Sequence, residues 1–60
     1  MAKTKNAFLN HVSEIKKKTG FIGVITHGDY DYLYRLYMLT TLAVFKEECT
    51  NFFNRKREEN

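Results

Sequence analysis

Apolar residues in the first third of the chain recur with the spacing of a helix. A stripe at intervals of four and three residues is formed by Phe8, Val12 and Ile15, which places these side chains on one helix face. Lysines occupy the expected last turn, at 16–18, where cations oppose the negative end of the helix dipole. Gly20 follows, and glycine readily takes the left-handed conformation that ends many helices. The pattern predicts a helix over about 6–18.

Residues 21–36 show a different pattern, because apolar and polar positions alternate on both sides of His27-Gly28. Alternate side chains of a strand point to opposite faces, and a two-residue turn ending in glycine joins the strands of many hairpins. The β-branched residues before this turn and the tyrosines after it also favour strands. The pattern predicts a β-hairpin over about 21–36.

The two faces of this expected hairpin differ in composition. One face collects residues that are almost wholly apolar or aromatic: Phe21, Gly23, Ile25, Tyr30, Tyr32 and Tyr34. The other face is mixed, with aspartates among aliphatic side chains. Four tyrosines within positions 30–37 exceed what so small a core can bury with every hydroxyl hydrogen-bonded. We therefore expect part of the hairpin to serve as a contact surface.

The last third of the chain returns to helical spacing. Alternating intervals of four and three residues define a seam of Met38, Leu42, Phe45, Cys49 and Phe52. The seam predicts a helix over about 37–57. Together these elements predict an α+β fold, a helix–β-hairpin–helix arrangement (αββα), in a single small domain over residues 1–60.

An all-α alternative stays open, in which a long C-terminal helix from Asp29 to Arg57 forms a helical hairpin with the first helix. Thr26 and Asp29 have the spacing of a capping box, which favours a helix start at this point. However, a helix of that length would span about 43 Å, whereas a compact domain of this size has a radius of gyration of about 10 Å. This overhang, together with the change of pattern at Met38, favours the αββα fold.

The length of the chain, 60 residues, limits the core that it can bury. Small domains are commonly reinforced by disulfides or zinc. Here Cys49 is the only cysteine, and His11 and His27 lack the spacing of a zinc site. Oligomerisation is the remaining common reinforcement. We therefore expect a homodimer or an obligate complex with a larger protein.

Targeting signals are not apparent in the sequence. The N-terminal residues lack the apolar segment of a signal peptide. The longest apolar-rich run, Tyr32–Phe45, contains Arg35 and is shorter than the roughly 20 residues that cross a bilayer. A lone cysteine is typical of a reducing compartment. The sequence thus predicts a cytoplasmic protein without a membrane partner.

The net charge of +3 is less informative than its distribution, because basic residues lie toward both ends of the chain. They are Lys3, Lys5, Lys16, Lys17, Lys18, Arg55, Lys56 and Arg57. In the αββα topology, residues 3–5 and 55–57 meet at the turn end of the hairpin, whereas 16–18 lie at the opposite end. This topology gives two basic caps, while phosphate binding favours one continuous basic surface. Nucleic-acid binding by a dimer that joins the caps is therefore the alternative function.

No residue pattern in the chain is typical of catalysis. The stretch 27–31 contains a histidine and two aspartates, but it does not match a calcium loop of the EF-hand type. Such a loop would need an oxygen ligand at position 33 and a glycine at position 34, where this chain has Leu33 and Tyr34. The sequence contains no glycine-rich phosphate loop and no nucleophile elbow. We expect no enzymatic activity, no cofactor and no metal site.

The remaining class is a protein-interaction module. Two strands leave free edges that can pair with another chain, and the mixed hairpin face has the aromatic and apolar content of an interface. The predicted partner-binding residues are Ile22, Val24, Asp31, Leu33 and Tyr37. We predict a small non-enzymatic binding protein, of inhibitor or adaptor type, that occupies a surface of a larger protein or complex. Compact inhibitors encoded by phages or mobile elements are similar in size and composition.

Overall fold

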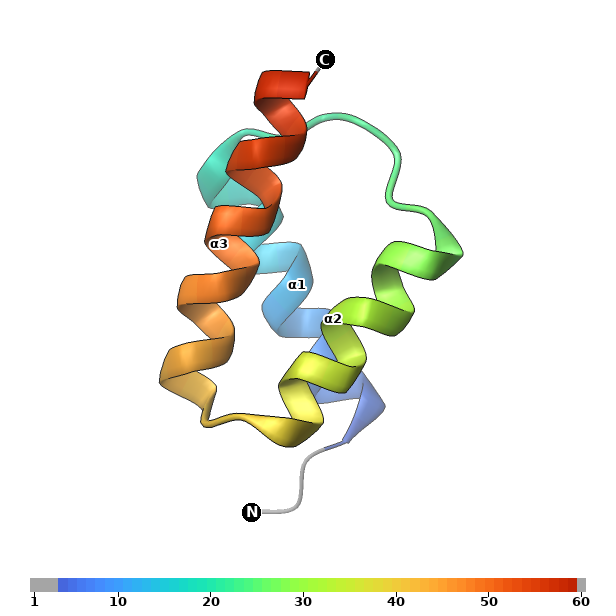
Figure 1. The fold of residues 1–60 in the computed structure, drawn as a ribbon. Helices are drawn as coiled ribbons and strands as arrows, with labels where there is room; N and C mark the ends of the chain where they lie inside the picture. Colours follow the sequence, from blue (N-terminus) through green and yellow to red (C-terminus); the bar gives the residue numbers. More distant parts are fainter. Residues whose placement is uncertain (1–3, 60) are drawn as a thin grey trace.

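The computed structural model describes residues 4–59, which form three helices and their two connections (Figure 1). The helices are α1 (Lys5–Thr19), α2 (His27–Leu39) and α3 (Leu42–Glu59). α1 and α3 run in the same direction and α2 runs in the opposite one (Figure 1). The C-terminal ends of α1 and α3 therefore lie at the same end of the molecule. The radius of gyration of the Cα atoms is 10.9 Å, close to the value of about 10 Å for a compact chain of this length.

α1 begins and ends with the caps that its sequence contains. The Thr4 hydroxyl accepts a hydrogen bond from the Ala7 amide at 3.1 Å. Gly20 follows the helix with a φ of 74°, and its amide donates to the carbonyl oxygen of Lys16 at 3.1 Å. A left-handed residue at this position satisfies a carbonyl that the last turn otherwise leaves free. The helix extends one residue further at each end than the predicted range.

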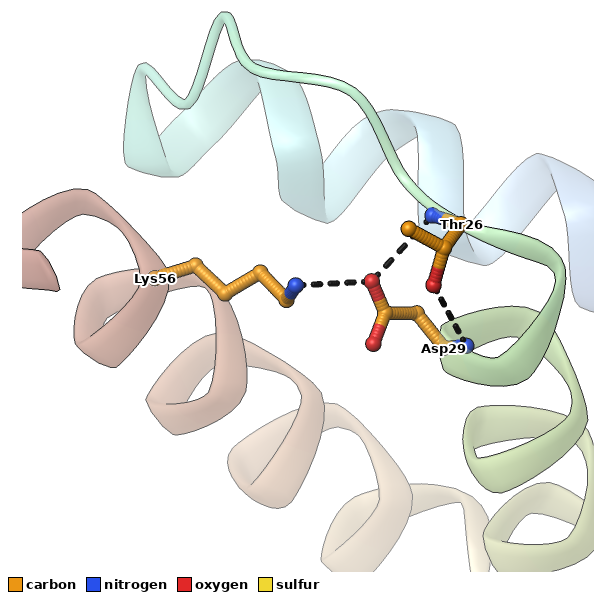
Figure 2. Close-up of polar contacts among 3 residues, drawn as sticks. All are labelled: Thr26, Asp29 and Lys56. Atoms are coloured by element: carbon orange, nitrogen blue, oxygen red, sulfur yellow. Dashed lines mark hydrogen bonds and ion pairs between the residues drawn. The ribbon is translucent and has the colours of Figure 1, made fainter. Parts of the chain in front are cut away.

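The predicted β-hairpin over 21–36 and the α+β fold class are wrong. None of the residues 4–59 lies in a strand, and residues 27–39 form α2. Thr26 and Asp29 form the capping box that the alternative fold requires. The Thr26 hydroxyl accepts from the Asp29 amide, and the Asp29 carboxylate accepts from the Thr26 amide, both at 3.2 Å (Figure 2). These bonds satisfy amides that a helix start otherwise leaves unpaired.

The alternation that suggested a strand conceals a helical stripe. Leu33 and Tyr37 lie four residues apart on α2 and are buried, while Tyr30 and Tyr34 pack partly buried against the same core. Tyrosine suits this boundary, because its ring covers apolar surface while its hydroxyl can stay in water. Helical spacing therefore outweighs the strand preference of the tyrosines.

The all-α alternative names the correct fold class, but its single helix over 29–57 is interrupted at Thr40-Thr41. The Thr40 hydroxyl donates to the carbonyl oxygen of Leu36 at 2.7 Å, and the Thr40 backbone is extended. The Thr41 hydroxyl then accepts from the Val44 amide at 3.3 Å, at the start of α3. This break turns α3 back along the molecule and removes the overhang of an unbroken helix (Figure 1).

The predicted helix over 37–57 and its apolar seam change accordingly. Met38 and Leu42, on the two sides of the break, are 47% and 41% exposed. Phe52, the last residue of the predicted seam, is only partly buried. The buried side chains of α3 are Phe45, Cys49 and Phe53. The break shifts the phase between α2 and α3, so a seam drawn through it wrongly places Leu42 in the core.

The core lies where the three helices meet and is largely aromatic. The ring of Phe8 from α1 lies 5.0 Å from that of Tyr34, 5.6 Å from that of Tyr37 and 6.0 Å from that of Phe45. The buried residues are Phe8, Val12, Ile15, Phe21, Leu33, Tyr37, Phe45, Cys49 and Phe53. Burial raises the pKa of the Cys49 thiol to about 12, so this side chain behaves as a small neutral residue.

Candidate interaction surface

The residues predicted to bind a partner do not share one face. Leu33 and Tyr37 are core residues of α2, because the hairpin face that would have exposed them does not form. Asp31 is exposed on α2, with a carboxylate oxygen 3.7 Å from Nε2 of His27. Ile22 and Val24 lie instead in the connection between α1 and α2, where they are 96% and 84% exposed. The structure therefore retains only these two aliphatic residues as an exposed apolar pair.

The strand-edge argument for a homodimer has no basis in this fold. It required free edges of a hairpin, and residues 21–36 contain no strand. The homodimer itself stays a prediction, now without a defined interface.

The basic residues are arranged differently from the two predicted caps. The Arg57 guanidinium donates from Nη1 to the carbonyl oxygen of Thr19 at 2.6 Å, which joins the last turns of α1 and α3. We call this part of the molecule the basic end and define it by Lys16, Lys17, Lys18, Arg55, Lys56 and Arg57. Lys5 lies at the opposite end, in the first turn of α1, and Lys3 lies outside the described residues. The two largest basic clusters thus lie at the same end of the molecule rather than at opposite ends.

One cation of the basic end is already paired. Nζ of Lys56 lies 2.7 Å from a carboxylate oxygen of Asp29, the capping residue of α2 (Figure 2). Burial disfavours the ionised Asp29 carboxylate, but hydrogen bonds from Lys56 and Thr26 outweigh this effect and lower its pKa. The ion pair ties the last turns of α3 to the start of α2. The other lysines and arginines carry the net positive charge of this end.

The connection 20–26 borders the basic end and is anchored at both of its sides. The Phe21 ring is buried and lies 5.5 Å from the ring of Phe53 on α3. Ile25 packs partly buried against the same core. Ile22 and Val24 alternate with these anchors and face solvent. The connection therefore exposes two β-branched side chains between segments that are fixed to the core.

A second feature of this end combines aromatic and basic side chains. Tyr32 and Phe52 lie with their ring centres 5.8 Å apart, and Nζ of Lys56 lies 5.5 Å from the centre of the Phe52 ring. Together with Arg55 these residues line a shallow depression. Exposed aromatic rings beside cations are the elements that stack and neutralise single-stranded nucleic acids.

The position of the basic end could not be read from local sequence. Its two clusters are visible in the sequence, but only the direction of the helices shows that they meet. The Lys56–Asp29 pair likewise joins residues that are far apart in the chain. The capping box at Thr26 was the one local signal that pointed to a helix after residue 26. Three helices in place of a hairpin and two helices bring the two basic clusters to the same end.

Three further findings concern other classes of site. Within residues 4–59, no group of three or more His, Cys, Asp or Glu side chains is placed to hold a metal ion. None of the described helices combines the length and the apolar character needed to cross a bilayer. Comparisons with protein-family models, with curated proteins and with solved structures find no match to this chain.

Proposed function

We propose that this chain is a small non-enzymatic binding protein, of inhibitor or adaptor type, that occupies a surface of a larger protein. The observation that carries the proposal is the nearly complete exposure of Ile22 and Val24 beside the basic end. Stable protein interfaces commonly have an apolar centre and a polar or charged rim. Here the exposed aliphatic side chains of the connection 20–26 would form the apolar centre, and the neighbouring cations would form the charged rim.

The exposed aliphatic pair favours a protein partner over a nucleic acid. Phosphate binding is driven by cations and does not use aliphatic side chains. The cations of the basic end also have local roles, because they lie at the C-terminal ends of two helices and oppose their dipoles. Ile22 and Val24 have no such local role in the fold. A free buried thiol, Cys49, is compatible with a reducing compartment, and we propose a cytoplasmic partner.

The proposal is tested by capture from a lysate with matched variants. Ile22→Asp should remove a specific nuclease-resistant partner, because it places a charge at the centre of the contact. Leu39→Asp is the control, since Leu39 is 77% exposed and is the last residue of α2, whose C-terminal end lies away from the basic end (Figure 1). Circular dichroism should show that both variants keep the helical fold. Equal capture by the two variants, or loss of all captured protein after nuclease treatment, would refute the proposal.

The alternative function, nucleic-acid binding, is favoured by a separate observation: Arg55 and Lys56 of the basic end lie beside the Tyr32 and Phe52 rings. Binding of a labelled single-stranded oligonucleotide should then weaken steeply with salt. Replacing Lys16, Lys17 and Lys18 by Gln should lower the slope by about 0.7 for each phosphate contact that is lost. Unchanged binding by Ile22→Asp in the same assay would support this alternative over a protein partner.

A further inference from the structure

We infer that Gly23 and the buried Phe21 ring hold Ile22 and Val24 outward as a preformed apolar contact for an acidic, amphipathic segment of the partner protein. This inference rests on the proposed function and adds to it the chemistry of the partner and the residues that position the contact.

The position of Gly23 depends on the absence of a side chain. A Cβ atom at this residue would lie 2.6 Å from Cζ and 3.0 Å from Cε1 of Phe21. Contacts this short require the ring or the backbone to move. The only described glycine with a positive φ is Gly20, so Gly23 is needed for close approach to the ring and not for a left-handed backbone. The connection can pass over the Phe21 ring at this distance only with glycine at position 23.

The Phe21 ring itself is held in place by the core. It is 5% exposed and packs on Phe53, so it cannot readily swing away to make room for a larger residue. With Phe21 fixed on one side and Ile25 packed on the other, the residues between them are directed to solvent. A contact surface that is already ordered in the free protein loses less conformational entropy on binding.

The charge beside Ile22 defines the chemistry of the partner. Lys16 and Lys17 line a shallow hollow together with Gly20, Phe21 and Ile22. Arg57, bonded to the Thr19 carbonyl, lies beside the same connection. A segment that packs apolar side chains on Ile22 would place its flanking residues next to these cations, where carboxylates are favoured. A second copy of this chain is disfavoured as the occupant, because it would bring identical cations together.

The test uses the full chain with labelled methyl groups and a panel of short synthetic peptides. One peptide carries leucines and glutamates on alternate faces. A second replaces the leucines by serine, and a third replaces the glutamates by glutamine. We expect the first peptide to bind at least about tenfold more tightly than either of the others. Its binding should shift the methyl signals of Ile22 and Val24 and leave those of Leu39 and Leu42 in place.

Positioning is tested by Gly23→Ala, with Gly28→Ala as the matched control. At Gly28 a Cβ atom meets only the Thr26 hydroxyl oxygen, at 3.9 Å, so this substitution should leave the affinity for the peptides unchanged. Gly23→Ala should weaken the leucine–glutamate peptide by at least about tenfold. The weaker, charge-driven binding of the serine peptide should be unaffected. A general loss of structure would weaken both peptides and would also move the core methyl signals of Val12 and Leu33, whereas loss of positioning affects only the apolar contribution.

Several outcomes would overturn the inference. They are equal binding of the leucine and serine peptides, methyl shifts at Leu39 instead of Ile22, or equal affinities of Gly23→Ala and Gly28→Ala. Should Gly23→Ala not fold, Ile22→Ser replaces it, and unchanged peptide binding by that variant has the same meaning. A partner that depends on Ile22 but tolerates Gly23→Ala would leave the proposed function intact and refute only the positioning. Displacement of the peptide by an oligonucleotide at equal concentration would refute both.

Discussion

The two connections between helices expose aliphatic side chains in different settings. The first, residues 20–26, is fixed to the core by Phe21 and is bordered by the basic end. The second consists of Thr40 and Thr41, which are held by hydrogen bonds to the helices on either side. Apolar residues exposed around the second connection are Met38, Leu39, Leu42 and Val44. Both regions expose apolar side chains. Only the first connection lies beside a cluster of cations and contains a buried residue of its own, Phe21.

This difference shows that exposure alone does not identify a binding surface. A chain of 60 residues cannot cover all of its apolar side chains. At the second connection, exposure follows from a tight break between two helices. At the first connection, a buried aromatic residue, Phe21, and the glycine packed against it, Gly23, hold two aliphatic side chains outward. The combination, rather than the exposure, supports a role in binding.

The largest effect that would separate the two connections is on stability. Phe21→Ala should lower the free energy of unfolding by about 3–5 kcal/mol, because it removes a buried ring that packs on Phe53. A loss of this size is comparable to the whole stability of a small domain. Leu39→Ala, at the second connection, should change it by less than about 0.5 kcal/mol. Urea denaturation followed by circular dichroism measures both. A small effect of Phe21→Ala would show that the first connection is not anchored.

A smaller effect is expected from the threonines that precede the helices. Thr26→Ala should cost about 1 kcal/mol, because it removes the hydroxyl that accepts from the Asp29 amide. Thr41→Ala should cost less, because residue 44 is a valine and no reciprocal carboxylate accompanies the bond from its amide to the Thr41 hydroxyl. Thermal denaturation of the two variants gives the ranking. The reverse ranking would show that the second connection is the more tightly capped.

Acid should weaken the first connection before the second. The lowered pKa of Asp29 means that, as pH falls, the unfolded chain takes up the proton before the folded chain does. The stabilisation from Asp29 is therefore complete above its usual pKa of 3.8 and is lost as pH falls through the lowered value. Asp29→Asn should remove this part of the pH dependence, at a cost below about 1 kcal/mol at neutral pH. The same acid limb in wild type and Asp29→Asn would contradict the role of the Lys56–Asp29 pair.

Local signals in the sequence predicted α1 but not α2. At α1, the apolar stripe, the lysines of the last turn and the terminal Gly20 all agree, and the structure uses each of them. At α2 the signals conflicted, because strand-like alternation competed with a capping box at Thr26. The ion pair from Lys56 to Asp29 that reinforces the capping box comes from α3, and no local pattern contains it.

The candidate surface was predictable only in part, because its residues were assigned from the predicted hairpin, which does not form. Ile22 and Val24 were named from their alternation with Phe21, and that alternation of buried and exposed residues is present. Leu33 and Tyr37 were assigned to the same face through a hairpin register that does not exist. The basic end depends on the number of chain reversals between the first and last helices. The αββα fold has three reversals and separates the clusters, whereas the structure has two and brings them together.

A small effect is also expected at Leu42, which the sequence pattern placed in a core seam and which the structure places just after the break at Thr40-Thr41. As a core residue, Leu42 would cost about 2–5 kcal/mol on replacement by alanine. In the structure it is 41% exposed in the first turn of α3, and alanine is an excellent helix former. Leu42→Ala should therefore lower the free energy of unfolding by only about 0.5 kcal/mol. Phe45→Ala, at a fully buried position of the same helix, is the matched control and should approach the loss expected for Phe21→Ala. If both α3 variants unfold alike, the chain does not break at Thr40-Thr41, and the second connection is part of the core.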